Sequence, residues 1–80
     1  MSSLPPLPSE PRPGRYRHYK GNEYQVEGLV RHSETLEVLV LYRALYGDTN
    51  ALWVRPQPMF VETITVAGRS QPRFARIDKA

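Results

Sequence analysis

Short runs of aromatic and β-branched residues, separated by turn residues, cover the chain from Gly14 onward. This pattern is typical of β-strands. Between residues 23 and 31, apolar or small residues alternate with mostly polar ones, as in an antiparallel strand with one buried face. The lysine, glycine and asparagine before this run favour a tight turn, so the pattern predicts a hairpin whose first strand covers residues 15–19. Gly28 indicates a bulge or a sharp bend, because glycine weakens a strand unless the backbone needs its freedom.

The most apolar run, residues 37–46, is compatible with two structures. Four residues from Leu36 to Arg43 lie at helical spacing, after a serine or threonine that could cap a helix. Val38, Val40 and Tyr42 instead favour a strand, and the run is short for a helix. We therefore predict a strand that is apolar on both faces.

Proline and glycine divide the rest of the chain into further short strands. Pro56 and Pro58 restrict pairing, so we expect one turn of 3₁₀ helix near residues 56–59. Further strands are predicted at residues 51–55, 61–66 and 72–77, joined by turns at residues 47–50 and 68–71. The complete pattern predicts an all-β fold of five or six short antiparallel strands.

Five of the eight prolines fall within the first thirteen residues. Proline fixes φ and removes a backbone donor, and terminal segments are disordered by default. We therefore predict a disordered Pro-rich tail at residues 1–13, one domain at residues 14–77 and a C-terminal tail at residues 78–80. The prolines from Pro5 to Pro8 also favour polyproline II, which suits an SH3-type groove, but Glu10 stands where a basic residue is expected.

Eighty residues with 40% hydrophobic content provide one small core. At this size a chain buries only about 60% of its unfolded surface, so shallow clefts are expected in place of a deep active site. The absence of cysteine excludes disulfides and thiolate metal sites. The longest apolar run is too short to span a membrane, and the N-terminus lacks the features of a secretory signal. We therefore expect a cytoplasmic protein.

Several motifs occur in the order that characterises one bacterial family. They are G-x-Y-x-H-Y-K-G-x-x-Y-x-V-x-G from Gly14, R-H-S-E-T from Arg31, V-x-Y-x-x-L-Y from Val40, L-W-V-R-P-x-x-M-F from Leu52 and R-F at Arg73. In these motifs the chain resembles the family catalogued as domain of unknown function 1653, over residues 14–77. The resemblance implies a small SH3-like barrel and a bacterial source, and it implies no activity.

The sequence contains little catalytic chemistry. His18 and His32 are the only histidines, and a metal site would require both to converge with a carboxylate such as Glu34. Ser33 is merely next to His32 in a predicted turn, and the chain has no glycine-rich phosphate loop, no HExxH and no GxSxG motif. We predict a protein that is not an enzyme and that has no cofactor and no metal.

Eight aromatic residues in so small a domain are expected mainly in the core. Three of them, Tyr19, Tyr46 and Trp53, lie at or near predicted strand ends, where SH3-type barrels line shallow grooves with aromatic rings. Arg55 shares a face with Trp53, which suits either a cation–π pair or an anchor and a charge reader for a ligand. With a histidine from the polar loop at residues 32–35, these residues form the candidate ligand groove: Tyr19, His32, Tyr46, Trp53 and Arg55.

Positive charge gathers near the two ends of the predicted domain. Residues 11–31 contain five basic and two acidic residues, and residues 69–80 contain four and one. The first and last strands of an SH3-type barrel are neighbours, so we expect a candidate basic face made of Arg15, Arg17, Arg73 and Arg76. With tyrosines between the arginines, such a face suits RNA or single-stranded DNA, and a solvated basic surface is the alternative.

These observations predict a monomeric module that binds a macromolecule without catalysis. A protein or peptide is the first candidate ligand, because aromatic rings and an arginine are expected together at the groove. Weak binding of RNA or single-stranded DNA through the basic face is the alternative. The two functions differ in salt dependence, because nucleic-acid affinity falls steeply with salt.

Overall fold

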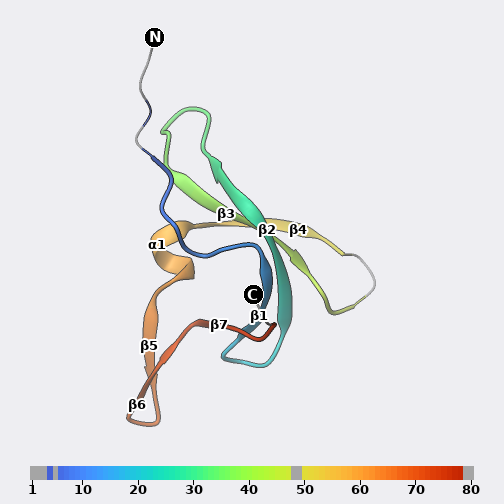
Figure 1. The fold of residues 1–80 in the computed structure, drawn as a ribbon. Helices are drawn as coiled ribbons and strands as arrows, with labels where there is room; N and C mark the ends of the chain where they lie inside the picture. Colours follow the sequence, from blue (N-terminus) through green and yellow to red (C-terminus); the bar gives the residue numbers. More distant parts are fainter. Residues whose placement is uncertain (1–3, 5, 48–49, 79–80) are drawn as a thin grey trace.

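The computed structural model describes residue 4, residues 6–47 and residues 50–78. The elements in chain order are β1 (Gly14–His18), β2 (Glu23–Arg31), β3 (Val38–Ala44), β4 (Leu52–Pro56), α1 (Gln57–Phe60), β5 (Thr63–Val66), β6 (Arg69–Pro72) and β7 (Phe74–Arg76) (Figure 1). The predicted all-β class is confirmed. Parts of the predicted tails and of the turn at residues 47–50 lie outside the described residues.

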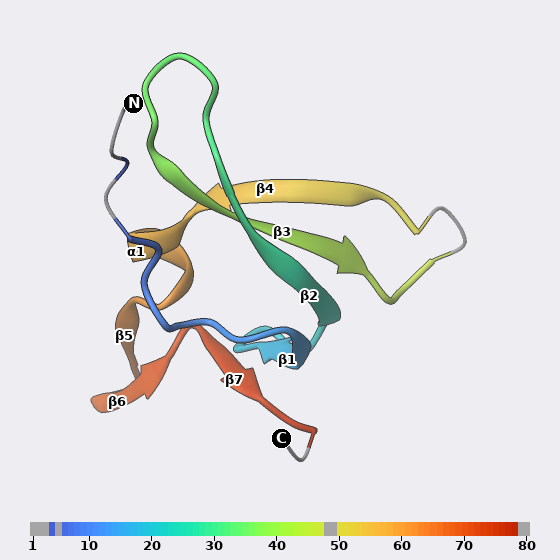
Figure 2. The same ribbon diagram turned by 45° about the horizontal axis from the view of Figure 1, so that its top comes forward.

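The strands form two antiparallel sheets. The larger has the order β4-β3-β2-β1-β7, and β5 pairs with β6 in the smaller. The first and last strands are neighbours, as expected: Tyr16 lies opposite Arg76, and His18 lies opposite Phe74. Backbone pairing does not close the described strands into a barrel (Figure 2). Pro56 ends β4, and the chain turns through α1 into the hairpin of β5 and β6, which pairs with no other described strand.

The long hairpin of β2 and β3 agrees with the sequence pattern. The register of the two strands shifts between Val26 and Gly28, so the predicted bulge is confirmed. Residues 38–44 form a strand and not a helix. On one face of β3 the side chains of Val40 and Tyr42 are buried, and Leu39 and Leu41 on the other face are half-buried.

The core lies on one face of the larger sheet, which we call the inner face. It consists of Tyr16, Val26, Val40, Tyr42, Phe60 and Phe74. Phe60 from α1 stacks on Phe74 with ring centroids 4.0 Å apart, and Tyr16 and Tyr42 meet Phe60 edge-on. Such ring pairs stabilise a fold beyond the area they bury. The short helix therefore closes the core of this small domain. We call the side of the larger sheet that faces away from this core the outer face.

Two connections differ from the sequence predictions. The turn at α1 is α-helical and not 3₁₀, since the Val61 N–H donates to the carbonyl oxygen of Gln57 at 3.2 Å. The spacing of the prolines does not distinguish the two helix types, because their hydrogen bonds differ only by one residue in the sequence separation of donor and acceptor. The last hairpin turns at Ala67 and Gly68, and not at residues 68–71 as predicted. Ala67 and Gly68 both have positive φ, as a type I′ turn requires.

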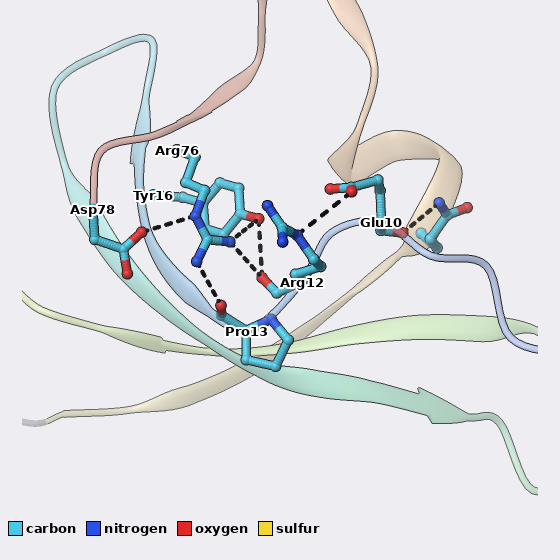
Figure 3. Close-up of polar contacts among 7 residues, drawn as sticks. Glu10, Arg12, Pro13, Tyr16, Arg76 and Asp78 are labelled. Atoms are coloured by element: carbon cyan, nitrogen blue, oxygen red, sulfur yellow. Dashed lines mark hydrogen bonds and ion pairs between the residues drawn. The ribbon is translucent and has the colours of Figure 1, made fainter. Parts of the chain in front are cut away.

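The residues just before β1 contact the domain. Pro11 is buried. The Gln57 side chain donates to the Glu10 carbonyl at 2.9 Å, and the Tyr16 hydroxyl donates to the Arg12 carbonyl at 2.9 Å (Figure 3). Residues 10–13, assigned to the tail from their prolines, are therefore attached to β1 and α1. No helix in the described part of the chain has the length and apolar character needed to cross a membrane.

Candidate functional site

β4 is an edge of the larger sheet. β3 pairs with one side of it, and no described strand pairs with the other (Figure 2). The Ala44 N–H donates to the Ala51 carbonyl at 3.0 Å, one position beyond the β3–β4 register. Because hydrogen-bonded and non-bonded pairs alternate in an antiparallel ladder, Leu52 and Val54 direct their backbone N–H and C=O groups away from β3. We call this unpaired side of β4 the free edge.

The free edge carries three consecutive exposed apolar side chains. Leu52, Trp53 and Val54 are 50%, 52% and 54% exposed. Protein edge strands usually carry charges or prolines that prevent pairing with another chain. In β4 such residues occur only at its C-terminal end, in Arg55 and Pro56. The strand thus combines unpaired backbone groups with exposed apolar surface.

Apolar residues continue from β4 across the outer face of the sheet. Val54 lies opposite Leu41 of β3, and Leu39 of β3 lies opposite Val30 of β2. Leu39 and Leu41 are half-buried, whereas Val30 is exposed. A side chain of an added strand opposite Val54 would therefore adjoin an apolar surface that is already present.

Arg55 lies at the same edge but points toward the inner face. It is opposite Val40, its Nε donates to the Tyr42 hydroxyl at 3.4 Å, and its guanidinium lies 5.3 Å from the ring centroid of Phe74. Within the described residues, Arg55 forms no ion pair with a carboxylate. Arg17, by contrast, pairs with Glu23 at 3.0 Å. Arg55 is thus a half-buried cation held by an aromatic ring and a hydroxyl.

Tyr24 connects the aromatic residues around Arg55. Its ring meets the rings of Tyr42, Tyr46 and Phe74 edge-on, with centroids 5.2, 5.5 and 5.7 Å away. The hydroxyls of Tyr24 and Tyr46 are 3.2 Å apart. Burial, together with this hydrogen bond, raises the pKa of Tyr24 to about 12. The Tyr24 hydroxyl is therefore neutral at physiological pH and can donate as well as accept hydrogen bonds.

His18 and Tyr19 continue this cluster at the end of β1. The His18 ring lies 4.9 Å from that of Phe74 and 4.5 Å from that of Tyr19. Burial lowers the pKa of His18, and the positive charges of Arg55, Arg73 and Lys20 lower it further. Three positively charged side chains therefore lie close enough to this end of the inner face to act on His18.

Four of the five residues predicted for the ligand groove belong to this region. Tyr19, Tyr46 and Arg55 join one network of rings through His18, Tyr24 and Phe74, and Trp53 lies opposite Tyr42 in the sheet. Four residues of this region were not predicted as site residues: His18, Tyr24, Tyr42 and Phe74. Alternation along β2 was the available signal for Tyr24, because it places this ring on the apolar face of the strand.

His32 does not belong to this region. It lies in the turn between β2 and β3, next to the Arg31–Val38 pair, whereas Tyr46 follows the other end of β3. Its Nδ1 accepts hydrogen bonds from the backbone N–H groups of Glu34 and Thr35, at 3.1 and 3.3 Å. His32 therefore stabilises its own turn.

A sequence model of the family described as "Protein of unknown function (DUF1653)" matches residues 14–76. The chain belongs to this family. A crystal structure of a DUF1653 protein from Bordetella bronchiseptica is similar in sequence and fold: the two chains are 40% identical, with a TM-score of 0.79. The similarity covers 89% of this chain and 92% of the Bordetella chain. Comparison with curated proteins gave no match.

The DUF1653 match contains the whole aromatic cluster and the free edge of β4. Residues 10–13 lie before it, although they contact the domain. Within the part of the chain that the structure describes, no group of three histidine or acidic residues could hold a metal ion, and no pocket is present. The candidate site of this DUF1653 domain is therefore an open surface and a sheet edge.

The four arginines of the predicted basic face do not form one free surface in the DUF1653 domain. β1 and β7 are adjacent, but Arg76 lies opposite the buried Tyr16, whereas Arg15 and Arg17 alternate with Tyr16 and so lie on the outer face. Arg17 pairs with Glu23, and Arg73 pairs with Glu62 at 3.0 Å.

Arg76 instead holds the N-terminal segment against β1. Its guanidinium donates to the carbonyl of Pro13 at 3.0 Å, to that of Arg12 at 3.4 Å and to the Tyr16 hydroxyl at 3.2 Å (Figure 3). Asp78 balances the charge at 3.0 Å. The arginine fills so much space that a Cβ atom on Gly14 would lie 2.6 Å from it. Arg76 is thus a structural residue of the DUF1653 domain.

Proposed function

We propose that this DUF1653 domain is a non-catalytic module that binds a protein or peptide by adding an extended segment of its partner to the free edge of β4. The observation that carries the proposal is the coincidence of unpaired backbone groups at Leu52 and Val54 with three half-exposed apolar side chains. In this mode of recognition the backbone hydrogen bonds provide affinity, and alternate side chains provide specificity.

The same proposal includes an SH3-like arrangement of the two sheets and a bacterial source. The antiparallel sheet packed on Phe60, together with the separate hairpin of β5 and β6, supports the first. The Bordetella relative supports the second. A monomer is the proposed state of the free protein, because Arg55 and Pro56 interrupt self-pairing of β4 through charge and through a missing N–H.

The arrangement of charge favours a peptide over a nucleic acid. Binding of single strands requires a groove of cations that follows the phosphate backbone. Arg17, Arg73 and Arg76 are each paired with a carboxylate of this chain. Arg76 also lies on the inner face, away from Arg15. An apolar strand edge matches an extended peptide better than it matches a polyanion.

The proposal is tested by NMR titration with a short neutral peptide of high strand propensity, the capped hexapeptide TQVFVT. Strand addition is expected to shift the amide signals of Leu52 and Val54 and to slow their hydrogen exchange, because these N–H groups become bonded. Trp53 is the only tryptophan, so its fluorescence reports burial at the same edge. Saturable shifts confined to another surface would refute the proposed binding mode.

Two variants probe the two components of the edge. Val54→Pro removes an N–H that points away from β3, and it is expected to abolish binding while β3 and β4 stay paired. Leu52→Ser removes exposed apolar surface and should weaken binding, whereas Leu36→Ser removes a similarly exposed leucine at the β2–β3 turn and should not. Equal binding by wild type, Val54→Pro and Leu52→Ser would exclude the edge of β4.

A further inference from the structure

We infer that the segment added to β4 carries an acidic side chain directly opposite Arg55, so that this domain recognises an acidic, otherwise apolar strand. The inference rests on the proposed function and names the chemistry of the partner. Among the residues that the structure describes, Arg55 has no carboxylate partner. Three further observations support it: the environment of Arg55, the ion pairs of the other strands and the local charge.

Arg55 is positioned for an anion that the described residues do not provide. Its Nε donates to Tyr42, and its cationic plane lies near the ring of Phe74. These contacts fix the side chain, and within the described residues no ion pair uses its terminal nitrogens. A guanidinium has five N–H donors in a rigid fork that fits a carboxylate. The fork of Arg55 is thus held in place with donors still available.

The interior strands of the same sheet show how their arginines are paired. Arg17 of β1 lies directly opposite Glu23 of β2, and the two side chains are 3.0 Å apart. Arg43 of β3 forms a diagonal pair with Glu27 of β2 at 3.3 Å. In both cases the carboxylate comes from the neighbouring strand. For Arg55 the equivalent position is on the free side of β4, where no described strand pairs.

The geometry of an added strand would place a carboxylate at this position. Directly opposed residues have Cβ atoms about 4.5–5.5 Å apart and point to the same face. A residue opposite Arg55 therefore points to the inner face, the face that also holds the Arg55 side chain. Lys20 and Arg73 lie near enough to His18 to influence it together with Arg55, so the surroundings attract an anion.

The neighbouring positions specify the rest of the partner strand. Residues opposite Leu52 and Val54 point to the outer face, where Val54 adjoins Leu41. A residue opposite Trp53 points to the inner face beside its half-exposed indole. In an antiparallel orientation, the partner therefore has an acidic residue followed by three apolar residues, the middle one aromatic.

Three capped hexapeptides that differ at one position test this inference: TEVFVT, TQVFVT and TKVFVT. Trp53 fluorescence and the amide shifts of β4 measure the affinity of each. We expect TEVFVT to bind about fivefold more tightly than TQVFVT, the size of a cross-strand charge pair, and TKVFVT to bind most weakly. Equal affinity of the first two would overturn the acidic partner and leave strand addition standing. Failure of all three to bind at β4 would overturn both.

Arg55→Gln should remove the preference for TEVFVT over TQVFVT while preserving the binding of TQVFVT. Arg15→Gln is the matched control, because Arg15 is an exposed arginine on the outer face of β1, and it should leave the preference unchanged. A second measurement is made on the wild-type protein alone. The carboxylate should offset the charge of Arg55, so TEVFVT should raise the pKa of His18, whereas TQVFVT should not. An unchanged pKa with saturating TEVFVT would contradict the contact.

Discussion

Tyr42 and Trp53 lie directly opposite each other in β3 and β4, yet Tyr42 is 6% exposed and Trp53 is 52% exposed. Both side chains are on the inner face of the sheet. Tyr42 lies between two other strands and under Phe60, whereas Trp53 has a described neighbouring strand on one side only. The position of the strand in the sheet, and not the alternation along it, determines the burial of these two rings.

This difference predicts unequal costs of truncation. Tyr42→Ala should lower the free energy of unfolding by about 3–5 kcal/mol, as for other buried aromatic residues. Trp53→Ala should cost roughly 1 kcal/mol, because half of the ring is already in water. Chemical denaturation of both variants measures the two values. A loss for Trp53→Ala as large as that for Tyr42→Ala would show that Trp53 belongs to the core.

A milder variant separates the Tyr42 ring from its hydroxyl. Tyr42→Phe keeps the ring contacts but removes the acceptor for Arg55 Nε. A typical hydrogen bond contributes about 0.5–1.5 kcal/mol to stability, so the variant should lose that amount and no more. A loss comparable to that of Tyr42→Ala would mean that the hydroxyl is required for packing.

Arg76 is predicted to stabilise the domain through the segment that precedes β1. Arg76→Gln removes the guanidinium that donates to Arg12, Pro13 and the Tyr16 hydroxyl, and it should cost about 1.5–3 kcal/mol, the range for hydrogen bonds that involve a charged group. Arg69→Gln is the control, since Arg69 is exposed in the hairpin of β5 and β6. Chemical denaturation compares the variants, and equal stability would contradict a structural role for Arg76.

The segment held by Arg76 also shows where sequence reasoning reaches its limit. Alternation correctly predicted the strand at β3, and the glycine signal correctly predicted the bulge at Gly28. Both depend on residues close together in the chain. The contacts of residues 10–13 come from Gln57 and Arg76, more than forty residues away, so a count of prolines does not reveal them.

The candidate site was predictable to a similar extent. Trp53 and Arg55 share a face because they are two positions apart in one strand. His32 lies outside the candidate site because it is at the turn of the β2–β3 hairpin, whereas the aromatic residues of the site are at the other end. Which end carries the site is a property of the assembled sheet. The position of Arg76 on the inner face could not be predicted either. Its strand is short, and the neighbouring apolar residue Ile77 does not indicate on which face the arginine lies.

The lowered pKa of His18 predicts a pH dependence of stability. Burial, then the charges of Arg55, Arg73 and Lys20, disfavour the charged imidazole in the folded protein. The unfolded chain, with its ordinary pKa of about 6.5, takes up this proton first as pH falls, so stability should decrease below about pH 6.5 and level off below the folded pKa. Denaturation of wild type and His18→Gln at several pH values measures this. An unchanged difference between them across this range would contradict the shift.

The Tyr24–Tyr46 contact predicts a change at the alkaline end. The pKa of Tyr24 is raised to about 12 by burial and then by Tyr46. Stability should therefore be lost as pH rises from about 10, where an unfolded tyrosine ionises, toward 12. Tyr46→Phe should lower the pKa of Tyr24 because it removes the hydrogen bond. NMR titration of ring-labelled tyrosine follows Tyr24 directly, and an unaltered pKa in the variant would leave burial as the whole cause.

The division of the arginines between two faces predicts weak and shallow salt dependence for any RNA binding. Four free arginines on one face would give a slope of log affinity against log salt of about −3, because each phosphate contact on a single strand contributes about −0.7. Arg76 holds the N-terminal segment, and Arg73 is paired with Glu62. Only Arg15 and Arg17 of the four then lie together on the outer face, so the slope should be no steeper than about −1.4.

Fluorescence anisotropy of labelled single-stranded RNA at several salt concentrations measures the slope, with Arg15→Ala and Arg73→Ala as paired variants. A slope near −3 that both variants reduce would show that the arginines act as one face, and it would favour RNA over a peptide as the ligand of this domain.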